Sequence, residues 1–547
     1  MQQVQVKHAE SGPELVFPPV FNIASELIDR HLDEGRGAKT AILTIDEAVD
    51  YAGLVDNVNR YGNALLGFGL QPGDRLLMVI KDAPEFYYIF WGSIKAGIIP
   101  VPLNTMLTPT DYKFIIADSG AKALVHSGEF RDQISAATSE GSSPQHILLA
   151  RHGDGCLHDM ACTAASVLDT RPATADDDCF WLYSSGTTGQ PKGVVHAHRD
   201  IAATCQLYSV NVLGGQESDI YYSIPKLFFA YGLGCGMTFP LWVGGTAVLD
   251  ARRPTPQIAA ELITRFKPTI FAAVPTFLAA FLAAGVATAK ELAGLRRCVS
   301  GGEALPEELQ RRWLEVAPVP ITDGIGSTEA LHIYLSNRLT DVRPNASGRV
   351  VPGYQARILD ENGAEILDGR PGRLWIKGPS VTRRYWNNPE KTAVCIVDGW
   401  LDTGDTYRRD DEGYYYYSGR NDDMLKVGGI WVSPFEVEGT LMSHPEVLEA
   451  AVVARADDAG LIKPEAWVVL RDPGRQNRAL VDDIRDFCKR SMAPYKYPRW
   501  IHFVEALPKT ATGKIQRFKL RTTVDNEVGG MGALPISSME LVGTERE

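Results

Sequence analysis

The sequence has few cysteines for its length, and they form no pattern. Among 547 residues there are eight, scattered between Cys156 and Cys488 without a C-x-x-C pair or a ligand-like spacing to histidine. This argues against a zinc site and against a disulfide framework. The first residues also lack the charged and then apolar pattern of a secretory signal. We therefore expect a protein of the reducing cytoplasm.

The chain also lacks an excess of basic residues and an uninterrupted membrane span. Its 55 lysines and arginines are outnumbered by 67 aspartates and glutamates, which gives a formal net charge of −12. Such a balance disfavours a surface for nucleic acid or for anionic membranes. Residues 268–289 form one long uncharged run, but Pro275 interrupts it. We interpret this run as a buried strand, turn and helix, and we expect no nucleic-acid or membrane partner.

The length and the pattern of the chain predict a mixed α/β protein with more than one domain. A chain of 547 residues exceeds one ordinary hydrophobic core. Residues 73–80 read as a turn entering a buried strand, residues 84–96 as an aromatic-rich helix, and residues 97–103 as the next strand. This order favours an α/β layered domain. From residue 423 onward, a strand, a helix, two strands and a helix indicate a compact second domain.

Residues 183–193, Tyr-Ser-Ser-Gly-Thr-Thr-Gly-Gln-Pro-Lys-Gly, are the most informative stretch. They lie between two apolar runs, so we interpret them as a glycine-rich loop between two strands. Gly186 and Gly189 let backbone N–H groups approach a polyanion, and Lys192 supplies positive charge. The loop is not a Walker A motif, because a proline precedes Lys192 and a glycine follows it. We predict a phosphate-binding loop of another type.

Further stretches fit a nucleotide-binding sheet. Residues 299–306 and 323–329 read as two strand ends, each followed by a glycine turn into a helix, which is what the carboxyl edge of a sheet needs to hold a nucleotide. Residues 196–200, His-Ala-His-Arg-Asp, contain an H-x-H pair, but no third metal ligand or kinase motif is near, so we interpret them as a helix start. Residues 225–234 combine aromatic residues with glycines, which suits either a flat ligand or core packing.

Together these stretches resemble the adenylate-forming superfamily, which holds acyl- and aryl-CoA synthetases, nonribosomal-peptide adenylation domains and luciferases. The resemblance extends from about residue 20 to about residue 522. It implies a large multi-subdomain adenylation and acyl-binding domain at residues 1–421, a small mobile domain at residues 422–522, and a flexible tail at residues 523–547. It also implies ATP, Mg²⁺ and CoA as the partners of a carboxylic acid, with an acyl-adenylate as the intermediate.

The resemblance assigns roles to residues that match the motifs of the superfamily. Lys514, in the motif at residues 508–517, would be the adenylation lysine, Thr328 would meet the α-phosphate and Glu329 would hold Mg²⁺. Asp422 would be the hinge, and Gly428 and Gly429 would lie on the CoA side. Many members carry an aromatic residue at the position of Ile325, so adenine stacking would differ here. The implied ATP-binding residues are Ser184, Ser185, Gly186, Thr187, Thr188, Gly189, Lys192, Gly302, Glu303, Asp323, Gly324, Ile325, Asp405 and Arg420.

Within the superfamily, residues 226–234 and 326–337 are similar to the benzoate–CoA ligase family. The similarity implies an acyl pocket lined by Ala230, Tyr231, Gly326, His332 and Ile333. Small residues beside flat ones suit a single unsubstituted ring. His332 remains open between a substrate contact and a hydrogen-bonded core histidine.

Several alternatives stay open at this point. The acid could be benzoate, 4-hydroxybenzoate, 2-aminobenzoate, a fluorobenzoate or a cyclic aliphatic acid. An aryl-acid adenylation enzyme that serves a carrier protein, a luciferase-like oxygenase and a non-catalytic binding protein are the rival classes. CoA-dependent release of AMP would separate them from an aryl-CoA ligase. The chain is expected to be a monomer or a homodimer.

Overall fold

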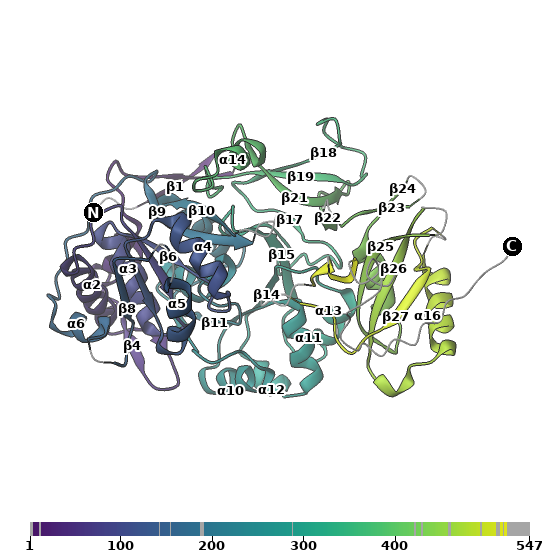
Figure 1. Cartoon of the computed structure of the whole chain (residues 1–547), viewed down its shortest axis with the longest axis horizontal. Coiled ribbons are helices and arrows are strands. Elements are labelled where there is room, and N and C mark those ends of the chain that lie inside the picture. The colour runs from purple at the N-terminus through teal and green to yellow at the C-terminus, as the bar shows by residue number, and fades with distance from the viewer. Residues whose placement is uncertain are drawn as a thin grey trace. The chain divides into compact units, whose positions relative to one another are not determined.

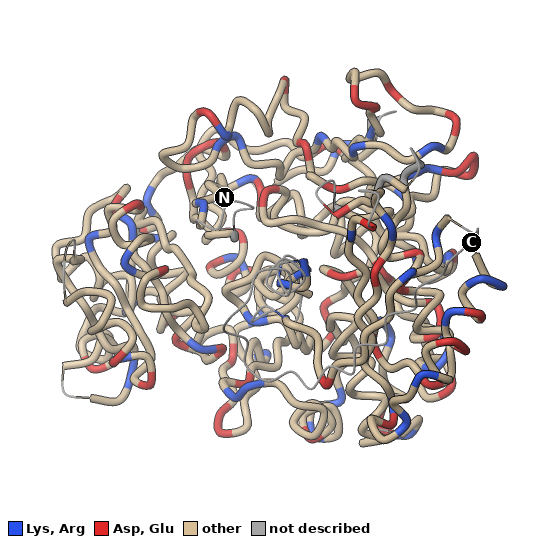
Figure 2. Tube along the Cα trace, turned by 45° about the vertical axis from the view of Figure 1, so that its right-hand side comes forward, with Lys and Arg blue, Asp and Glu red and all other residues tan. Residues whose placement is uncertain are grey.

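The computed structural model describes residues 4–9, 12–139, 141, 143–153, 155–185, 191–286, 288–420, 423–427, 430–457, 461–492, 495–509, 515–517 and 519–521. The chain divides into two compact units (Figure 1). The first comprises Met1–Ala356 and Trp375–Thr403, and the second comprises Arg357–Leu374 and Gly404–Glu547. Figure 2 shows lysine and arginine interspersed with aspartate and glutamate along the described trace of both units.

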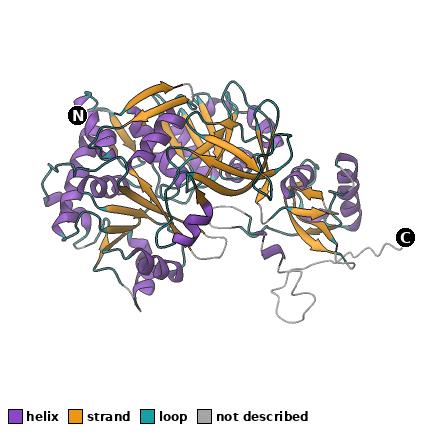
Figure 3. Ribbon diagram, turned by 90° about the horizontal axis from the view of Figure 1, so that it is seen from above, coloured by secondary structure: helices purple, strands orange, loops and turns teal. Residues whose placement is uncertain are grey.

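The largest sheet of the first unit has nine strands in the order β17-β16-β15-β14-β13-β11-β12-β3-β4. Its six central strands are parallel, and β4, β16 and β17 run antiparallel to their neighbours. Figure 3 shows helices lying beside the strands of the first unit. The strands are β3 (Thr40–Leu43), β4 (Ala48–Asp50), β11 (Ile220–Ser223), β12 (Thr246–Val248), β13 (Ile270–Ala273), β14 (Arg297–Gly301), β15 (Ile321–Gly326), β16 (Ile333–Ser336) and β17 (Arg349–Val350).

Helices α10 (Pro256–Phe266), α11 (Pro275–Ala284), α12 (Ala289–Leu292) and α13 (Glu307–Leu314) share a hydrophobic core with this sheet. Phe271 of β13 packs there against Phe281 of α11 and Trp313 of α13. The run at residues 268–289 thus contains a buried strand and, after Val274, a helix that begins at Pro275, which agrees with the predicted strand, turn and helix. Among the described residues, no helix is long and apolar enough to cross a membrane.

A second, four-stranded parallel sheet has the order β6-β5-β7-β8, from β5 (Arg75–Val79), β6 (Ile99–Pro102), β7 (Ala123–His126) and β8 (His146–Leu149). Helix α2 (Tyr51–Gly67) begins at Asp50, whose carboxylate accepts a hydrogen bond from the Gly53 N–H. Helix α3 (Pro84–Ala96) is buried along its whole length and ends at Gly97 in the left-handed conformation, which glycine adopts without strain. Helices α4 (Pro109–Ser119), α5 (Arg131–Thr138) and α6 (Leu157–Thr163) complete this part of the unit.

Two hairpins form separate two-stranded sheets among the described residues of the first unit. The N-terminal one pairs β1 (Gln5–Ala9) with β2 (Gly12–Val16). The other pairs β9 (Asp178–Ser185) with β10 (Pro191–Ala197), which confirms that two strands flank the glycine-rich stretch. Helix α7 (His198–Thr204) follows β10 directly, so the interpretation of residues 196–200 as a helix start is also confirmed. Shorter helices are α1 (Arg30–Asp33), α8 (Ala230–Leu233), α9 (Phe239–Val243) and α14 (Pro389–Cys395), and β20 (Ile396–Val397) is a short strand.

The prediction that residues 323–329 turn into a helix is wrong. Strand β15 continues through Gly326, and the chain then turns back and pairs with itself as the antiparallel strand β16. The sequence of β16, Ile-Tyr-Leu-Ser, is fully buried, and its branched and aromatic side chains suit a strand. Leu331, in the turn, has a φ of 65°, a left-handed conformation that a leucine rarely adopts and that ends regular structure.

The second unit contains the five predicted elements of the C-terminal region: β23 (Leu425–Val427), α15 (Pro434–Met442), β25 (Val447–Ala456), β26 (Ile462–Leu470) and α16 (Arg478–Ser491). The structure adds two short strands, β24 (Ile430–Val432) beside β23 and β27 (Trp500–Phe503) parallel to β26. One apolar core joins these elements, and it includes Val437, Val452, Val468 and Ile484. Upstream, β22 (Tyr415–Arg420) pairs with the end of β21 (Trp400–Arg409). Strand β18 (Gln355–Leu359) ends in this unit, and strand β19 (Gly372–Lys377) begins in it.

Candidate active site

The β9–β10 hairpin places Lys192 directly opposite Ser184. Lys192 lies on β10, the strand that follows the glycine-rich stretch. The Ser184 hydroxyl has no hydrogen-bond partner among the described residues. A Cβ atom on Gly193 would lie 3.2 Å from both Tyr183 and Trp386, so the base of the hairpin is tightly packed. Four predicted phosphate-binding residues and the side chain of a fifth lie outside the described residues: Gly186, Thr187, Thr188, Gly189 and the Ser185 side chain.

Lys192 and Glu329, predicted to bind phosphate and Mg²⁺, form an ion pair. The Lys192 Nζ lies 2.8 Å from the Glu329 Oε1, and the Tyr385 hydroxyl donates to the same oxygen at 2.9 Å. Tyr385 also accepts from Lys192 at 3.2 Å, and the ammonium lies 4.5 Å from the centre of its ring. Burial acts to raise the pKa of Glu329, but Lys192 and Tyr385 lower it below its usual value. The carboxylate therefore stays charged in a shielded place.

Tyr385 was not foreseen from the sequence. It precedes Trp386-Asn387-Asn388, a stretch in which the only visible signal was an aromatic pair before a turn and a helix start. Its contacts with Lys192 and Glu329 join three segments far apart in the chain. Burial raises the pKa of the Tyr385 phenol and so keeps it protonated as a donor.

Further predicted ATP-binding residues lie on and after the neighbouring strands β14 and β15. Asp323 in β15 is 5% exposed, its Oδ1 has no hydrogen-bond partner among the described residues, and burial raises its pKa well above the usual range. Gly324 and Ile325 follow it and pair with β16. At the end of β14, Gly302 is exposed with a φ of 86°, and the Glu303 carboxylate accepts from the N–H and hydroxyl of Thr276, at 3.0 and 2.7 Å.

This donor set fits ATP and Mg²⁺. Asp323 offers a buried polar atom that still lacks a partner, as recognition of a base requires. No group of three or more His, Cys, Asp or Glu side chains in the described part of the chain could hold a metal by itself. Magnesium is commonly held by one or two carboxylates together with the phosphates of a substrate. Glu329 supplies one such carboxylate, so the residues present suit a metal that arrives with the nucleotide.

Four of the five predicted acyl-pocket residues come together in the first unit: Tyr231, Gly326, His332 and Ile333. Tyr231 donates from its hydroxyl to the Val299 carbonyl at 2.9 Å, which fixes its ring beside His332 with the ring centres 5.6 Å apart. A Cβ on Gly326 would lie 2.5 Å from the His332 carbonyl oxygen, so only glycine fits this close approach. Ala230 opens helix α8 next to Tyr231, and Ile333 is buried at the start of β16.

His332 is enclosed by aromatic rings. It is 3% exposed, and its ring centre lies 4.5 Å from that of Phe239 and 5.2 Å from that of Tyr208. Its Nε2 lies 3.3 Å from the Tyr231 carbonyl oxygen, whereas Nδ1 has no partner among the described residues. Burial lowers its pKa to about 3, so the imidazole is neutral at pH 7. His332 is thus packed like a core histidine, but its Nδ1 atom is unpartnered among the described residues. Its contact with a substrate stays a prediction.

The second unit brings together two of the predicted ATP-binding residues, Asp405 and Arg420. Asp405 in β21 and Arg420 in β22 are direct cross-strand neighbours, and Asp405 is buried. Four predicted residues lie outside the described residues and keep their roles as predictions: Asp422, Gly428, Gly429 and Lys514. All eight cysteines lie in described segments, and all are free thiols.

Comparison with known families identifies the chain. The family model described as AMP-binding enzyme matches residues 29–386, which is more than half of the chain. The chain belongs to the AMP-binding enzyme family. A second model, for the C-terminal domain of AMP-binding enzymes, matches residues 436–514.

Relatives of this AMP-binding enzyme confirm its resemblance to the adenylate-forming superfamily and to the benzoate–CoA ligases. A benzoate–CoA ligase from Thauera aromatica is 48% identical over 518 residues, which cover 94% of this chain and 98% of that protein. A 4-hydroxybenzoate–CoA/benzoate–CoA ligase from Rhodopseudomonas palustris is 40% identical and covers 94% and 95% of the two chains.

Solved structures confirm the mixed α/β fold, with a large N-terminal and a smaller C-terminal domain. A benzoate CoA ligase from Burkholderia xenovorans superposes with a TM-score of 0.86 at 42% identity, covering 92% of this chain and all of that one. An anthranilate CoA ligase in complex with anthranoyl-AMP gives a TM-score of 0.88 at 41% identity and covers 93% and 98% of the two chains.

Proposed function

We propose that this AMP-binding enzyme converts benzoate, or a closely similar aromatic acid, to its CoA thioester. It is an AMP-forming acid–thiol ligase that uses ATP, Mg²⁺ and CoA. The observation that carries the proposal is the turn between β15 and β16. One side of this turn presents a charged carboxylate held by Lys192 and Tyr385, and the other presents an apolar set of aromatic rings around His332.

The first half-reaction makes the acid reactive. A carboxylate is a poor electrophile, so its oxygen attacks the α-phosphorus of ATP, the bond to the β-phosphate oxygen breaks, and an acyl-adenylate and pyrophosphate form. Catalysis of such a step consists mainly of positioning and charge stabilisation. In our proposal Glu329 holds Mg²⁺, Lys192 turns from Glu329 to the departing phosphates, and Thr328 bonds the α-phosphate. Lys514 bonds both the acid and the α-phosphate.

The second half-reaction transfers the acyl group to a thiol. The CoA sulfur attacks the acyl carbon, the bond to AMP breaks, and the thiol proton leaves to solvent. We propose that residues 422–522 act as a domain that pivots at Asp422 between the two halves, so that Lys514 leaves and Gly428 and Gly429 arrive. Residues 1–421 would remain the adenylation domain and residues 523–547 a tail.

The aromatic set favours a small flat acid. Tyr231, His332 and Ile333 lie around close-packed glycines, so this set is small and mainly apolar, which suits an unsubstituted ring. This supports benzoate ahead of 4-hydroxybenzoate and 2-aminobenzoate, although relatives bear the names of ligases for these acids too. A relative named p-hydroxybenzoic acid–AMP ligase supports an aryl-acid adenylation enzyme as the second candidate.

One experiment separates these functions. The enzyme is incubated with ATP, Mg²⁺ and a panel of aromatic acids, and AMP release is measured with and without CoA. We expect benzoate to give the highest kcat/KM and AMP release to depend on CoA. Release of AMP only with an acyl carrier protein would contradict the proposal.

A second experiment tests the role of Lys514. Lys514→Ala should abolish adenylation and leave transfer from a synthetic acyl-adenylate to CoA largely intact, because the charge is needed only where pyrophosphate leaves. Equal loss in both half-reactions would contradict the assignment.

The remaining expectations concern the cellular compartment and the oligomeric state. Eight free thiols in described segments support a reducing compartment, which we propose is the cytoplasm. We also propose that the enzyme is a monomer or a homodimer, which a measurement of its mass in solution decides.

A further inference from the structure

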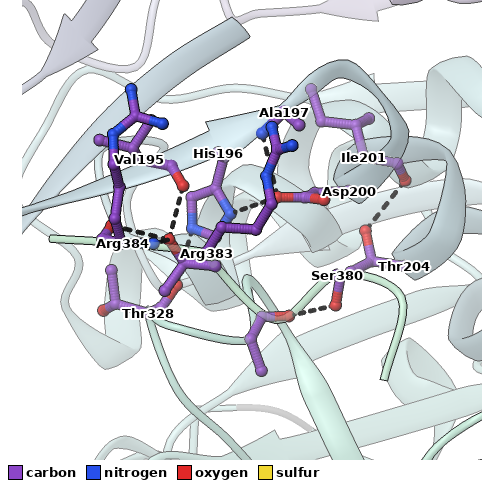
Figure 4. Close-up of polar contacts among 12 residues, drawn as sticks. Val195, His196, Ala197, Asp200, Ile201, Thr204, Thr328, Ser380, Arg383 and Arg384 are labelled. Atoms are coloured by element: carbon purple, nitrogen blue, oxygen red, sulfur yellow. Dashed lines mark hydrogen bonds and ion pairs between the residues drawn. The ribbon is translucent and has the colours of Figure 1, made fainter. Parts of the chain in front are cut away.

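His196 lies outside the predicted site and yet contacts the turn that carries Glu329. It is fully buried at the end of β10, and its ring stacks on Phe180 with the ring centres 5.2 Å apart. Its Nε2 lies 2.8 Å from the Thr328 carbonyl oxygen and its Nδ1 lies 2.9 Å from the Asp200 Oδ2 (Figure 4). The β10 register shifts between His196 and Ala197, and bulges of this kind re-aim side chains.

The hydrogen bonds of His196 fix its protons. A carbonyl oxygen only accepts, so Nε2 must carry a proton. The bond between Nδ1 and Asp200 requires a second proton between those two atoms, while the same Asp200 oxygen also accepts from the Ala197 N–H at 3.0 Å. Whichever atom holds the shared proton, the pair of side chains holds two protons and is neutral overall. A neutral, fully bonded pair is what a buried site tolerates.

Three successive carbonyl groups of the turn are held in this way. Besides the bond from His196 to Thr328, the Thr382 N–H donates to the Glu329 carbonyl at 2.7 Å, and the Ser380 hydroxyl donates to the Ala330 carbonyl at 2.6 Å. The Thr382 hydroxyl in turn donates to the Val195 carbonyl at 2.6 Å, next to His196. The backbone of the turn is therefore tied to β10 and to residues 380–382.

The turn needs such support because it is strained. Leu331 has a φ of 65°, a left-handed conformation that residues with a side chain rarely adopt. Strained backbone persists only where its surroundings determine it, and it gathers at functional sites. The Leu331 N–H bonds the same Thr328 carbonyl at 3.0 Å that His196 bonds, so His196 acts on the strained turn itself.

We propose that the His196–Asp200 pair is a positioning element that presets the Thr328–Glu329 turn for the metal-bound nucleotide. The inference rests on the proposed function, because it assumes that this turn serves adenylation. His196 touches no reacting atom; it acts through the Thr328 carbonyl. A misplacement of about 1 Å at a catalytic group can cost roughly 100-fold in rate.

The test compares His196→Leu with His198→Leu in both half-reactions. His198, two residues away, is equally buried, but it accepts a hydrogen bond from the Ile23 N–H at 3.2 Å and so is tied to the N-terminal region. Adenylation is measured as acyl-adenylate formed in a single turnover, and transfer as thioester formed from synthetic benzoyl-adenylate and CoA. His196→Leu should slow adenylation roughly 10- to 100-fold and leave transfer within about threefold. His196→Gln, whose amide can donate to Thr328, should recover most of the loss.

Three outcomes would overturn the proposal. The first is that His196→Leu adenylates at the wild-type rate. The second is that His196→Leu slows both half-reactions in the same ratio as His198→Leu does, because this would indicate a general effect on the fold. If His196→Leu does not fold, the test uses Asp200→Asn instead, which keeps the shape of the Asp200 side chain. Wild-type adenylation in folded Asp200→Asn would then overturn the proposal.

A binding measurement keeps this inference separate from the proposed function. If the wild-type enzyme forms no adenylate from any aromatic acid, the proposed function fails on its own. The affinity for ATP is then compared with and without Mg²⁺. The gain that Mg²⁺ gives to the wild type should be at least fivefold smaller in His196→Leu and unchanged in His198→Leu. An equal gain in all three proteins would overturn the positioning role.

Discussion

Glu329 and His332 lie three residues apart in one turn, in opposite electrostatic surroundings. Glu329 has Lys192 and Tyr385 beside it, and its pKa falls below the usual value although burial acts to raise it. His332 has aromatic rings around it, and burial lowers its pKa to about 3. A shielded group thus stays charged only where an opposite charge accompanies it. The same turn therefore carries a charged residue, Glu329, in an ionic environment and a neutral residue, His332, in an aromatic one.

Removing the charge of Glu329 should have the largest effect. Glu329→Gln keeps the shape of the side chain but leaves Lys192 without its counter-charge, and it removes the carboxylate that we propose to hold Mg²⁺. Loss of one such electrostatic group costs roughly 100- to 1,000-fold in kcat. We expect this loss in adenylation together with a higher Mg²⁺ requirement. Glu307→Gln, an exposed glutamate at the start of α13, is the control with the same change in charge. An unchanged Mg²⁺ titration in Glu329→Gln would contradict the comparison.

Crowding the neutral side should affect the acid and not the nucleotide. A Cβ on Gly234 would lie 2.3 Å from the His332 Cδ2, so Gly234→Ala must displace the imidazole. Overfilling of this kind costs about 1–3 kcal/mol, or roughly 5- to 150-fold in kcat/KM for benzoate. Gly439→Ala in helix α15, where an added Cβ meets nothing within 4 Å, is the control. Loss of ATP affinity in Gly234→Ala would show that the two sides are not separate.

Weakening the ionic side without removing its charge should give a smaller loss. Tyr385→Phe removes the hydroxyl that bonds both Glu329 and Lys192. A hydrogen bond to a charged group contributes about 1.5 kcal/mol or somewhat more, so we expect adenylation to slow roughly tenfold. Transfer from a synthetic adenylate should stay near the wild-type rate. Slowing of both steps by the same factor would place Tyr385 outside the nucleotide side.

As the pH falls, the stabilising contribution of His332 should be lost before that of Glu329. His332 has a folded pKa of about 3 against an ordinary 6.5, so its contribution to stability is complete above pH 6.5 and is lost as the pH falls toward 3. The loss is about 1.4 kcal/mol per pH unit within this window. The pKa of Glu329 is lowered from 4.5, so its contribution is lost only below that pH.

The measurement is the first thermal unfolding transition between pH 7 and pH 5, in the wild type and in His332→Leu. The variant should lose a few degrees less than the wild type over this range, because it lacks one group that binds a proton on unfolding. Equal slopes would contradict the buried neutral state of His332.

The local pattern of the chain predicted much of the fold. The two strands around residues 183–193, the strand and helix on either side of Pro275 and the five elements of the C-terminal region all follow from apolar spacing and turn residues, which act over short distances. The helix expected after residues 323–329 failed because its glycines and Ser/Thr residues suit any tight turn. The antiparallel return of β16 depends on burial against β15 and β17, which no local pattern reveals.

The contacts that build the site were the harder part. Lys192 and Glu329 were predicted by motif, but Tyr385 reaches Lys192 across 193 positions of the chain and His196 reaches Thr328 across 132. Such pairings arise from tertiary packing, and a single sequence carries no sign of them. His196 in particular lies in a stretch that reads as an ordinary helix start, and it is the second-last residue of β10, just before helix α7.

The closed connection between β15 and β16 has a consequence for changing the substrate of this enzyme by directed evolution. Gly326 and His332 lie at the two ends of the segment that carries Glu329, and Gly326 approaches the His332 carbonyl too closely for any larger residue. A library that varies both ends will therefore recover many variants that bind a new acid and fail to activate it. Ala230 opens helix α8, outside that segment, so varying it is the safer route to new acids if it lines the acyl pocket as we propose.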